Sequence, residues 1–415
     1  MRRLFVVAAM LMVACGQTPG RTVLSNASPA LSATAAPVSA TAVASAPRVG
    51  TTPSPSAARS PLPQPTTSAA LLFAVLEAKG TANPFQWNTV AIAGLDGYAR
   101  AKATFTPMPS PWVGCAGPVL PLSAQVAAGK VFFADSTGTV RSLSAHGQLA
   151  VVATFPMISS QQMLSFAVSP DGTRLLGAVF TIPPKPASGD PCTSGGPMFG
   201  PGDFTLDVYV AGNGGGILRV DHEVLPTSST SSVPNIMALL GWDSIGPLGT
   251  YPTAWATQGG GPRHYNGIPV RVDATNGRVG GQISQQGVCD VIDIAATGDF
   301  LCLPVVASGA AVDLSVRRPD GSEIWRASQP NADFFLAYMS PDEQRLFALG
   351  TTSEALGRDG SVIPVAAAFS FDGWLDSGTV IGGGYNTNLD YVSLSSPNTV
   401  VDLGFKGIFI GTVQT

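Results

Sequence analysis

The sequence predicts an all-β domain, and three observations lead to that class. Short apolar or alternating runs, separated by Gly, Pro, Asp and Asn, fill residues 70–415, which is the pattern of many short strands. We find no helical apolar period sustained over about twelve residues in this region. Strand–turn–strand segments of similar sequence recur along it, and repeats of about 40 to 50 residues are typical of propeller blades. We therefore expect a single β-propeller.

Residues 1–14 predict a signal peptide. Arg2 and Arg3 form a basic n-region, and an apolar run from Leu4 to Cys15 follows. The run is shorter than the roughly 20 residues that a membrane-spanning helix needs, and a polar, proline-rich tract begins at Gly16. The segment is therefore expected to direct export and then to be removed.

The run Leu11-Met12-Val13-Ala14-Cys15 resembles the bacterial lipobox, with Met12 where that family usually carries Leu. The resemblance implies that Cys15 is lipidated, becomes the first residue after cleavage, and anchors the protein in the cell membrane or outer membrane, facing away from the cytoplasm. Several acyl chains would hold it firmly, because each buried methylene contributes about 0.8 kcal/mol. The alternative is an ordinary cleaved signal with an incidental Cys15.

Residues 15–69 are predicted to be a lipidated Cys15 followed by a disordered linker. The tract is rich in Ala, Ser, Thr, Pro and Val and contains no Asp or Glu. It cannot bury enough apolar surface to offset the entropy of ordering the chain. A flexible coil of this length spans on the order of 40 Å, so we expect it to hold the domain of residues 70–415 clear of the membrane.

The domain carries a negative net charge. The chain has 22 Lys and Arg residues and 26 Asp and Glu residues, and five of the basic residues but none of the acidic ones precede residue 70. The domain is therefore near −9. Nucleic acids and anionic lipid surfaces both favour clustered Lys and Arg, so we expect no nucleic-acid partner.

Two kinds of hairpin repeat along the domain. The first has a Ser-Pro-Asp-Gly or related turn and occurs at 166–180, 336–349 and, more loosely, 292–303. In its clearest copy, Pro170 presets φ, Asp171 can bond its own backbone and Gly172 accepts positive φ. The second kind is predicted to be an outer hairpin and occurs at 131–143, 269–279 and 314–325. Alternation of the two kinds predicts seven blades, at 70–112, 113–160, 161–227, 234–287, 288–331, 332–367 and 368–415.

The Ser-Pro-Asp-Gly hairpins resemble those of TolB-type and WD-repeat-like bacterial propellers, over about a quarter of the domain. The resemblance implies an architecture and not an activity, because the same turn occurs in propellers of unrelated function. A pair of β-sandwich domains is the structural alternative. Against it, no linker-like stretch interrupts residues 70–415.

Four cysteines follow Cys15, and an even number in an exported chain suggests disulfides. We expect Cys115 and Cys192, both in loop-like stretches, to be able to pair. Cys289 and Cys302 flank one predicted hairpin, but a turn centred on Thr297 and Gly298 would place Cys302 opposite Asp293. Their direct pairing then requires a change of register, and three connectivities stay open.

We assign no catalytic residue, metal site or cofactor. The three histidines, His146, His222 and His264, fall in different predicted blades, and no Gly-x-Ser-x-Gly nucleophile elbow or zinc-ligand spacing occurs. Glycosidase-type chemistry needs two carboxylates about 5 to 10 Å apart. The candidate pairs for it are Asp290 with Asp293 and Asp372 with Asp376, although solvated turn residues are the simpler interpretation.

The segment Tyr251–Asn266 is the richest candidate for ligand binding. Its Trp255, Arg263, His264 and Tyr265 offer stacking faces and hydrogen-bond donors in a Gly-rich sequence, and such residues are enriched at binding hot spots. The simpler interpretation is a long hairpin whose Trp255 packs between blades.

The sequence thus favours a membrane-tethered, non-enzymatic binding scaffold for a protein or an extracellular ligand such as a glycan. The alternative is a secreted hydrolase or lyase that uses carboxylates on the propeller face. A part in envelope assembly is implied only by the resemblance to TolB-type propellers.

Overall fold

The computed structural model describes residues 71–78, 87–109, 111–112, 124–188, 199–212, 216–225, 237–252, 267–283, 289–304, 312–329, 336–350, 352–366, 369–383 and 387–414. The regular elements in these ranges are β-strands, which confirms the predicted all-β class. Within the same ranges no helix could span a membrane.

Five sheets contain four antiparallel strands each, in simple sequence order. They are formed by β4 (Ala124–Ala127), β5 (Lys130–Ala134), β6 (Thr139–Ser144) and β7 (Leu149–Thr154); β8 (Gln162–Val168), β9 (Arg174–Thr181), β10 (Phe204–Gly212) and β11 (Ile217–Leu225); β12 (Ala238–Trp242), β13 (Pro247–Pro252), β14 (Gly267–Val272) and β15 (Val279–Gln282); β16 (Cys289–Ile294), β17 (Phe300–Pro304), β18 (Val312–Arg317) and β19 (Glu323–Gln329); and β20 (Leu336–Met339), β21 (Arg345–Leu349), β22 (Glu354–Gly357) and β23 (Val362–Pro364).

The sixth sheet has seven strands because one strand is shared. Its order is β24-β25-β26-β27-β1-β2-β3, and its members are β1 (Leu72–Glu77), β2 (Thr89–Gly94), β3 (Ala99–Thr104), β24 (Phe371–Asp376), β25 (Thr379–Gly382), β26 (Asn388–Ser393) and β27 (Val400–Val413). Residues 400–406 of β27 pair with β26, and residues 407–413 pair with β1. Gly404, with φ of +72°, lies just before this change of partner.

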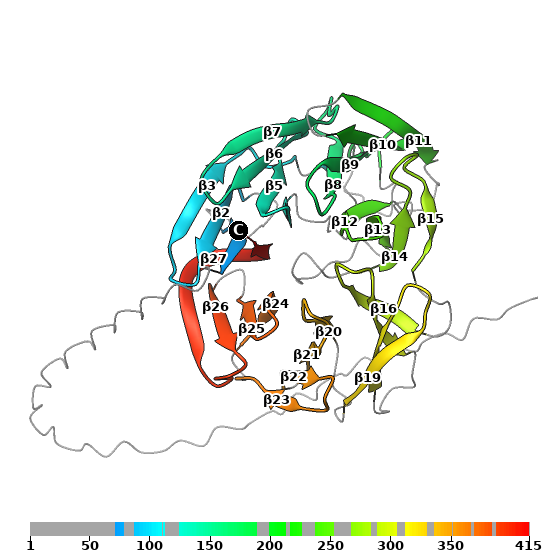
Figure 1. Ribbon diagram of the computed structural model, residues 1–415. Helices are drawn as coiled ribbons and strands as arrows, with labels where there is room; N and C mark the ends of the chain where they lie inside the picture. Colours follow the sequence, from blue (N-terminus) through cyan, green and yellow to red (C-terminus); the bar gives the residue numbers. More distant parts are fainter. Residues whose placement is uncertain are drawn as a thin grey trace, which may run out of the picture. The chain divides into compact units, whose positions relative to one another are not determined.

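If each half of β27 is counted separately, the described strands form seven four-stranded units arranged in a ring (Figure 1). We call these units blades 1 to 7: blade 1 contains the second half of β27 with β1–β3, and blades 2 to 7 follow in chain order. The C-terminal strand thus closes the ring by pairing with the first strand of the domain. The innermost strands are residues 407–413 of β27, β4, β8, β12, β16, β20 and β24, which we call the inner ring.

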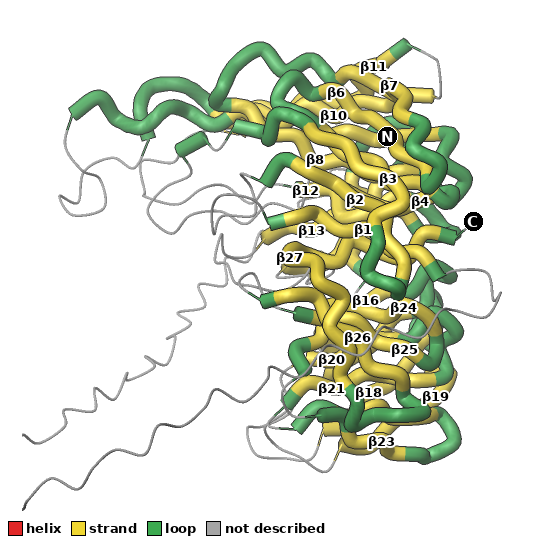
Figure 2. The backbone as a smooth tube through the Cα atoms, turned by 90° about the vertical axis from the view of Figure 1, so that its left-hand side faces the viewer, coloured by secondary structure: helices red, strands yellow, loops and turns green. Residues whose placement is uncertain are grey.

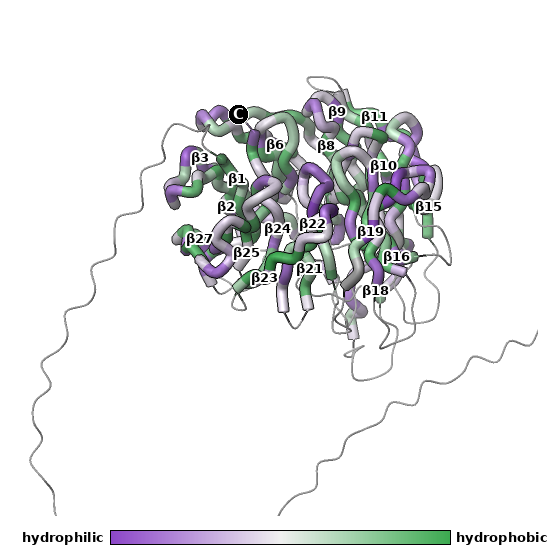
Figure 3. The backbone as a smooth tube through the Cα atoms, turned by 60° about the horizontal axis from the view of Figure 1, so that its bottom comes forward, coloured by the Kyte–Doolittle hydropathy of each residue, from purple (hydrophilic) through white to green (hydrophobic). Residues whose placement is uncertain are grey.

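The core of the domain lies between the blades. Among the described residues, buried apolar clusters join blades 1 and 2, 2 and 3, 3 and 4, 5 and 6, 6 and 7, and 7 and 1. The cluster beside the joint of blades 4 and 5 is the smallest and contains Cys289, Val291, Phe300 and Cys302 with Ile283 at its edge. Figure 3 shows the hydrophobic residues, in green, recurring along the strands.

The Ser-Pro-Asp-Gly turn forms the β8–β9 hairpin as expected. Gly172 has φ of +70°, and its N–H donates to the Ser169 carbonyl at 2.8 Å. The Asp171 carboxylate accepts the Thr173 N–H at 3.0 Å and the Ser169 hydroxyl at 2.6 Å. Hydrogen bonds from Ser169 and Thr173 lower the pKa of Asp171 to about 2. The turn is thus built from the local side chains that the sequence named.

The equivalent turn of blade 6 has Glu343 where blade 3 has Gly172. Glu343 adopts φ of +58°, a left-handed conformation that is uncommon for residues other than glycine. Two bonds to blade 5 hold it: the Thr297 hydroxyl donates to Glu343 Oε1 at 2.5 Å, and the Trp325 indole N–H donates to the Glu343 carbonyl at 3.0 Å. Burial raises the pKa of Glu343, and the neighbouring Asp299 carboxylate raises it further, although the hydrogen bond from Thr297 lowers it.

The predicted hairpins match observed strand pairs. The first kind corresponds to β8–β9, β20–β21 and β16–β17, and two of the second kind are the outer hairpins β14–β15 and β18–β19. The segment 131–143 is instead β5–β6, the middle pair of blade 2, because β4 and β7 flank it on either side. Its prediction as an outer hairpin was therefore wrong, since one strand–turn–strand pattern suits either place.

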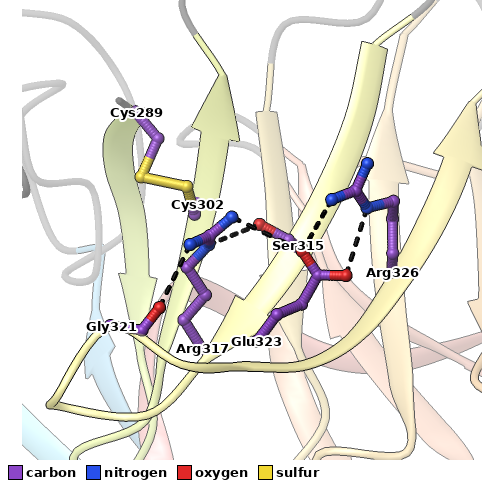
Figure 4. The surroundings of a disulfide bond; sticks show 7 residues. All are labelled: Cys289, Cys302, Ser315, Arg317, Gly321, Glu323 and Arg326. Atoms are coloured by element: carbon purple, nitrogen blue, oxygen red, sulfur yellow. Dashed lines mark hydrogen bonds and ion pairs between the residues drawn. A yellow bond between two sulfur atoms is a disulfide. The ribbon is translucent and has the colours of Figure 1, made fainter. Parts of the chain in front are cut away.

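A disulfide joins Cys289 on β16 to Cys302 on β17, with a Cα–Cα distance of 5.5 Å (Figure 4). The expected register, with Cys302 opposite Asp293, was wrong. Leu301 lies opposite Asp293, and Cys302 lies opposite Val291, because a bulge at Ile292 shifts the pairing. Cys289 itself lies opposite Pro304, so the disulfide joins diagonal neighbours and not a directly opposed pair. The outer hairpin beside it is held by Arg317, which bonds Ser315 and the Gly321 carbonyl.

Candidate functional site

The two ends of the ring are built differently. First-to-second and third-to-fourth strands meet at one end, which we call the turn end; short connections such as 128–129 and 377–378 lie there. Second-to-third and blade-to-blade connections lie at the opposite loop end, because the strands of each blade alternate in direction. β3, β9 and β13 end there, at Thr104, Thr181 and Pro252. In the side view of Figure 2, the C-terminus lies on the right among described turns.

The sequence-predicted binding residues lie outside the described residues. Trp255, Arg263, His264 and Tyr265 fall between β13, which ends at Pro252, and β14, which begins at Gly267. Cys15, Cys115 and Cys192 also lie outside the described residues. Their assigned roles therefore stay predictions.

Described residues close in sequence to Cys115 and Cys192 contact each other at the loop end. The Lys185 ammonium lies 4.7 Å from the centre of the Trp112 ring, in a cation–π geometry. Trp112 precedes Cys115 by three positions and Lys185 precedes Cys192 by seven. This contact brings together two chain segments that are far apart in sequence; the pairing of the two cysteines stays a prediction.

The described histidines do not form a site together. His146 is exposed in the β6–β7 turn of blade 2 at the turn end. His222 lies on the outermost strand of blade 3, where its Nδ1 is 2.8 Å from Asp207 Oδ1, an atom that also accepts from Arg219. The two residues therefore lie on different blades, as the sequence predicted.

Polar side chains of the inner ring bond neighbouring blades. Gln125 on β4 donates to the Phe166 carbonyl of blade 3 and accepts the Val168 N–H, and it also donates to the Leu240 carbonyl of blade 4 at 3.2 Å. Ser165 on β8 accepts the Leu239 N–H of blade 4 at 2.9 Å. These side chains join blades 2, 3 and 4.

The same arrangement continues around the ring. The buried Asp293 carboxylate on β16 accepts the Met339 N–H of blade 6 at 2.8 Å and the N–H of Ile294 at 2.9 Å. The Trp374 indole of blade 7 donates to the Tyr338 carbonyl of blade 6 at 3.4 Å. Thr412 on β27 donates to the Leu375 carbonyl at 2.9 Å. Inner-ring polar groups thus mainly hold the ring closed.

Among the described residues, Asp290 and Asp372 are the inner-ring carboxylates without a hydrogen bond or ion pair, and of these two Asp372 is the one that is partly buried. It is the second residue of β24, so it lies at the loop end, and the register of β24 with β25 shifts between Phe371 and Gly373 on either side of it. It is half-buried, and no hydrogen bond or ion pair joins its carboxylate to another described residue. Burial alone raises the pKa of Asp372 to about 7. A carboxyl that titrates near neutrality is a candidate for binding or proton transfer.

Neither predicted carboxylate pair acts as a unit. Asp293 is engaged by two backbone N–H groups, whereas Asp290 is exposed. Asp376 lies at the far end of β24 from Asp372 and accepts the Gly378 N–H of the β24–β25 turn at 2.8 Å. In each pair, one carboxylate, that of Asp293 or Asp376, bonds backbone N–H groups of the fold, and the other does not.

Within the described ranges, no group of three or more His, Cys, Asp and Glu residues is placed to hold a metal ion. Sequence reasoning considered Asp372 only as half of a pair. The available signal was an acidic residue inside the first strand of a blade, between Phe371 and Trp374. Its lack of a partner depends on the neighbouring blades and has no signature in the sequence.

No protein-family model matches the sequence, and no curated protein is significantly similar to it. Solved structures match at 10 to 14% identity. The oligogalacturonate lyase in complex with manganese has 10% identity and a TM-score of 0.45 over 74% of this chain and 82% of that chain. A functionally unknown protein from Desulfotomaculum acetoxidans has 10% identity and a TM-score of 0.43 over 82% and 98%. TolB from Acinetobacter baumannii has 14% identity and a TM-score of 0.36 over 85% and 68%.

TolB is thus among the similar structures, as the Ser-Pro-Asp-Gly hairpins led us to expect. At these identities and TM-scores the similarities carry no argument about activity. The β-propeller assignment rests on the strand pairing described above.

Proposed function

We propose that the chain is a membrane-tethered, extracytoplasmic binding module that presents the loop end of its propeller to a protein or an extracellular glycan. The observation that carries this proposal is the place where the chain enters the ring. β1 begins at Leu72, which pairs with Val413 near the C-terminus at the turn end. An N-terminal tether would therefore leave from the turn end, and the opposite loop end would remain free for a ligand.

The tether is tested through Cys15. Full-length protein should incorporate labelled fatty acid and fractionate with membranes, whereas Cys15→Ser should lose both properties. A Cys15→Ser variant that is still lipidated, or wild type found only in the soluble fraction, would remove the tether from the proposal.

The binding face is tested by blocking one end of the ring at a time. Ile158, between blades 2 and 3 at the loop end, is 88% exposed, and His146 on blade 2 is exposed at the turn end. Polyethylene glycol attached to I158C should abolish capture of envelope proteins or arrayed glycans, while the same polymer on H146C should leave capture intact. Equal effects at both ends would contradict the proposal.

A second candidate function is a hydrolase or lyase, and the observation that favours it is the pKa of Asp372, raised to about 7. A general acid or base works best when its pKa is near the working pH. This function requires turnover of an extracellular polysaccharide by the purified chain and a loss of roughly 10²- to 10⁴-fold in Asp372→Asn. Equal turnover by both proteins would exclude the role of Asp372.

A further inference from the structure

We propose that the loop end of the inner ring binds a positively charged group, a primary ammonium or a guanidinium, at the Asp372 carboxylate. This inference rests on the proposed binding function and names the chemistry of its ligand. It starts from a contrast among polar side chains that occupy the same ring of strands.

Four polar side chains of the inner ring have partners in a neighbouring blade. Gln125, Ser165, Asp293 and Thr412 bond backbone groups at distances from 2.5 to 3.3 Å. Asp372 has no such bond within the described part of the chain. Asp293 is the closest comparison, because it is also an aspartate of an innermost strand and its carboxylate meets two N–H groups.

The backbone that carries Asp372 is held firmly on both sides. Phe371 stacks on Phe347 with ring centres 4.3 Å apart and lies 4.8 Å from Tyr338. Trp374 is 1% exposed and bonds the Tyr338 carbonyl. Between these anchors, the strand bulges at Asp372, and bulges often redirect a side chain beside a functional site. The backbone at Asp372 is therefore fixed before any ligand arrives.

The surroundings of Asp372 disfavour its charged form, and no described side chain stabilises that form. Burial is the sole cause that raises its pKa to about 7, and no charged side chain of the described residues contributes. A half-buried ionisable group without a partner destabilises the fold when it is ionised. Such a group is expected to persist where a ligand supplies the missing partner.

A single carboxylate suits an organic cation better than a metal ion. Calcium takes six to eight oxygen ligands, and zinc takes about four, whereas no cluster of metal-ligating side chains occurs among the described residues. An ammonium or guanidinium group needs one counter-ion and forms strong charge-assisted hydrogen bonds with it. The negative charge of the domain also attracts cations.

The test uses the full chain in detergent, with n-butylammonium as the probe and n-butanol as its neutral counterpart at constant ionic strength. Wild type should gain thermal stability with the ammonium and not with the alcohol, and Asp372→Asn should lose this response. As the pH is raised toward about 7, the apparent affinity for n-butylammonium should increase by up to tenfold per pH unit, and above about pH 7 it should level off. The reason is that the cation binds the ionised carboxylate.

A matched pair of variants separates a ligand site from a structural role. Without the probe at pH 8, Asp372→Asn should melt above wild type, since it removes an unpaired charge, while Asp293→Asn should melt below it. The proposal is overturned if the ammonium stabilises wild type and Asp372→Asn equally, or if Asp372→Asn lowers the melting temperature as Asp293→Asn does. If it is overturned while polymer on I158C still blocks capture, the binding function stands and its ligand is not cationic.

Discussion

Removal of the Cys289–Cys302 disulfide should lower the stability of the domain by about 3 kcal/mol. The two residues are separated by 13 positions, and the loop-closure model gives about 3 kcal/mol at 25 °C for a loop of this length. The bond also lies in the smallest of the apolar clusters, beside the joint of blades 4 and 5, where few other side chains compensate for its loss.

The measurement is urea unfolding of Cys289→Ala, Cys302→Ala and the double variant. Both cysteines are buried, at 4% and 2% exposure, so Ala avoids the cost of burying a Ser hydroxyl. With an m-value on the order of 3 kcal/mol/M, the midpoint should fall by about 1 M in each single variant. The double variant should fall little further, because either change alone breaks the bond. Unchanged midpoints, or single effects that simply add, would refute this reasoning.

Three further predictions concern other parts of the ring. Phe155 is fully buried, and its ring fills the space beside Gly177, so Phe155→Ala should cost about 3 to 5 kcal/mol in urea unfolding; a loss below 1 kcal/mol would contradict the packing. The raised pKa of Glu343 means that its contribution to stability is present below the unfolded pKa and is lost as pH rises through the folded pKa. The melting temperature of Glu343→Gln should therefore lie above that of wild type at pH 7 and equal it at about pH 4. A variant that melts below wild type at pH 7 would contradict this reasoning. Peptides containing Cys115 and Cys192 should be linked in a non-reduced digest analysed by mass spectrometry, and two free thiols would end that prediction.

Local features of the architecture could be predicted from the sequence. The Ser-Pro-Asp-Gly turn is specified by its own four residues, because proline, aspartate and glycine each favour the φ or the hydrogen bond that the turn needs. The predicted segments from 113 onward each contain four strands, the last being shared. The sharing of β27 could not be predicted, since it depends on pairing between residues more than 300 positions apart.

The disulfide register shows the limit of arguments from spacing. The sequence places the turn near Thr297 and Gly298, and a regular ladder from that turn puts Cys302 opposite Asp293. The observed ladder already differs by one residue at the turn, where Ile294 lies opposite Phe300, and the extra residue at Ile292 displaces it again, so that Cys289 and Cys302 become diagonal neighbours. A bulge has no distinct sequence pattern here, because Ile292 is an ordinary strand residue.

Asp293 and Asp372 have similar sequence contexts but different contacts in the structure. Both are aspartates in the first strand of a blade, and the sequence treats them alike. Asp293 meets the Met339 N–H of the next blade, so it helps to close the ring; Asp372 meets no such donor among the described residues. A sequence specifies a fold when its local preferences agree with that fold. Positions that depart from this agreement and gain no stabilising contact are those where function is expected. In this ring the half-buried position of this kind is Asp372, at the end of the propeller opposite the entry of the chain, whereas the unbonded Asp290 is exposed.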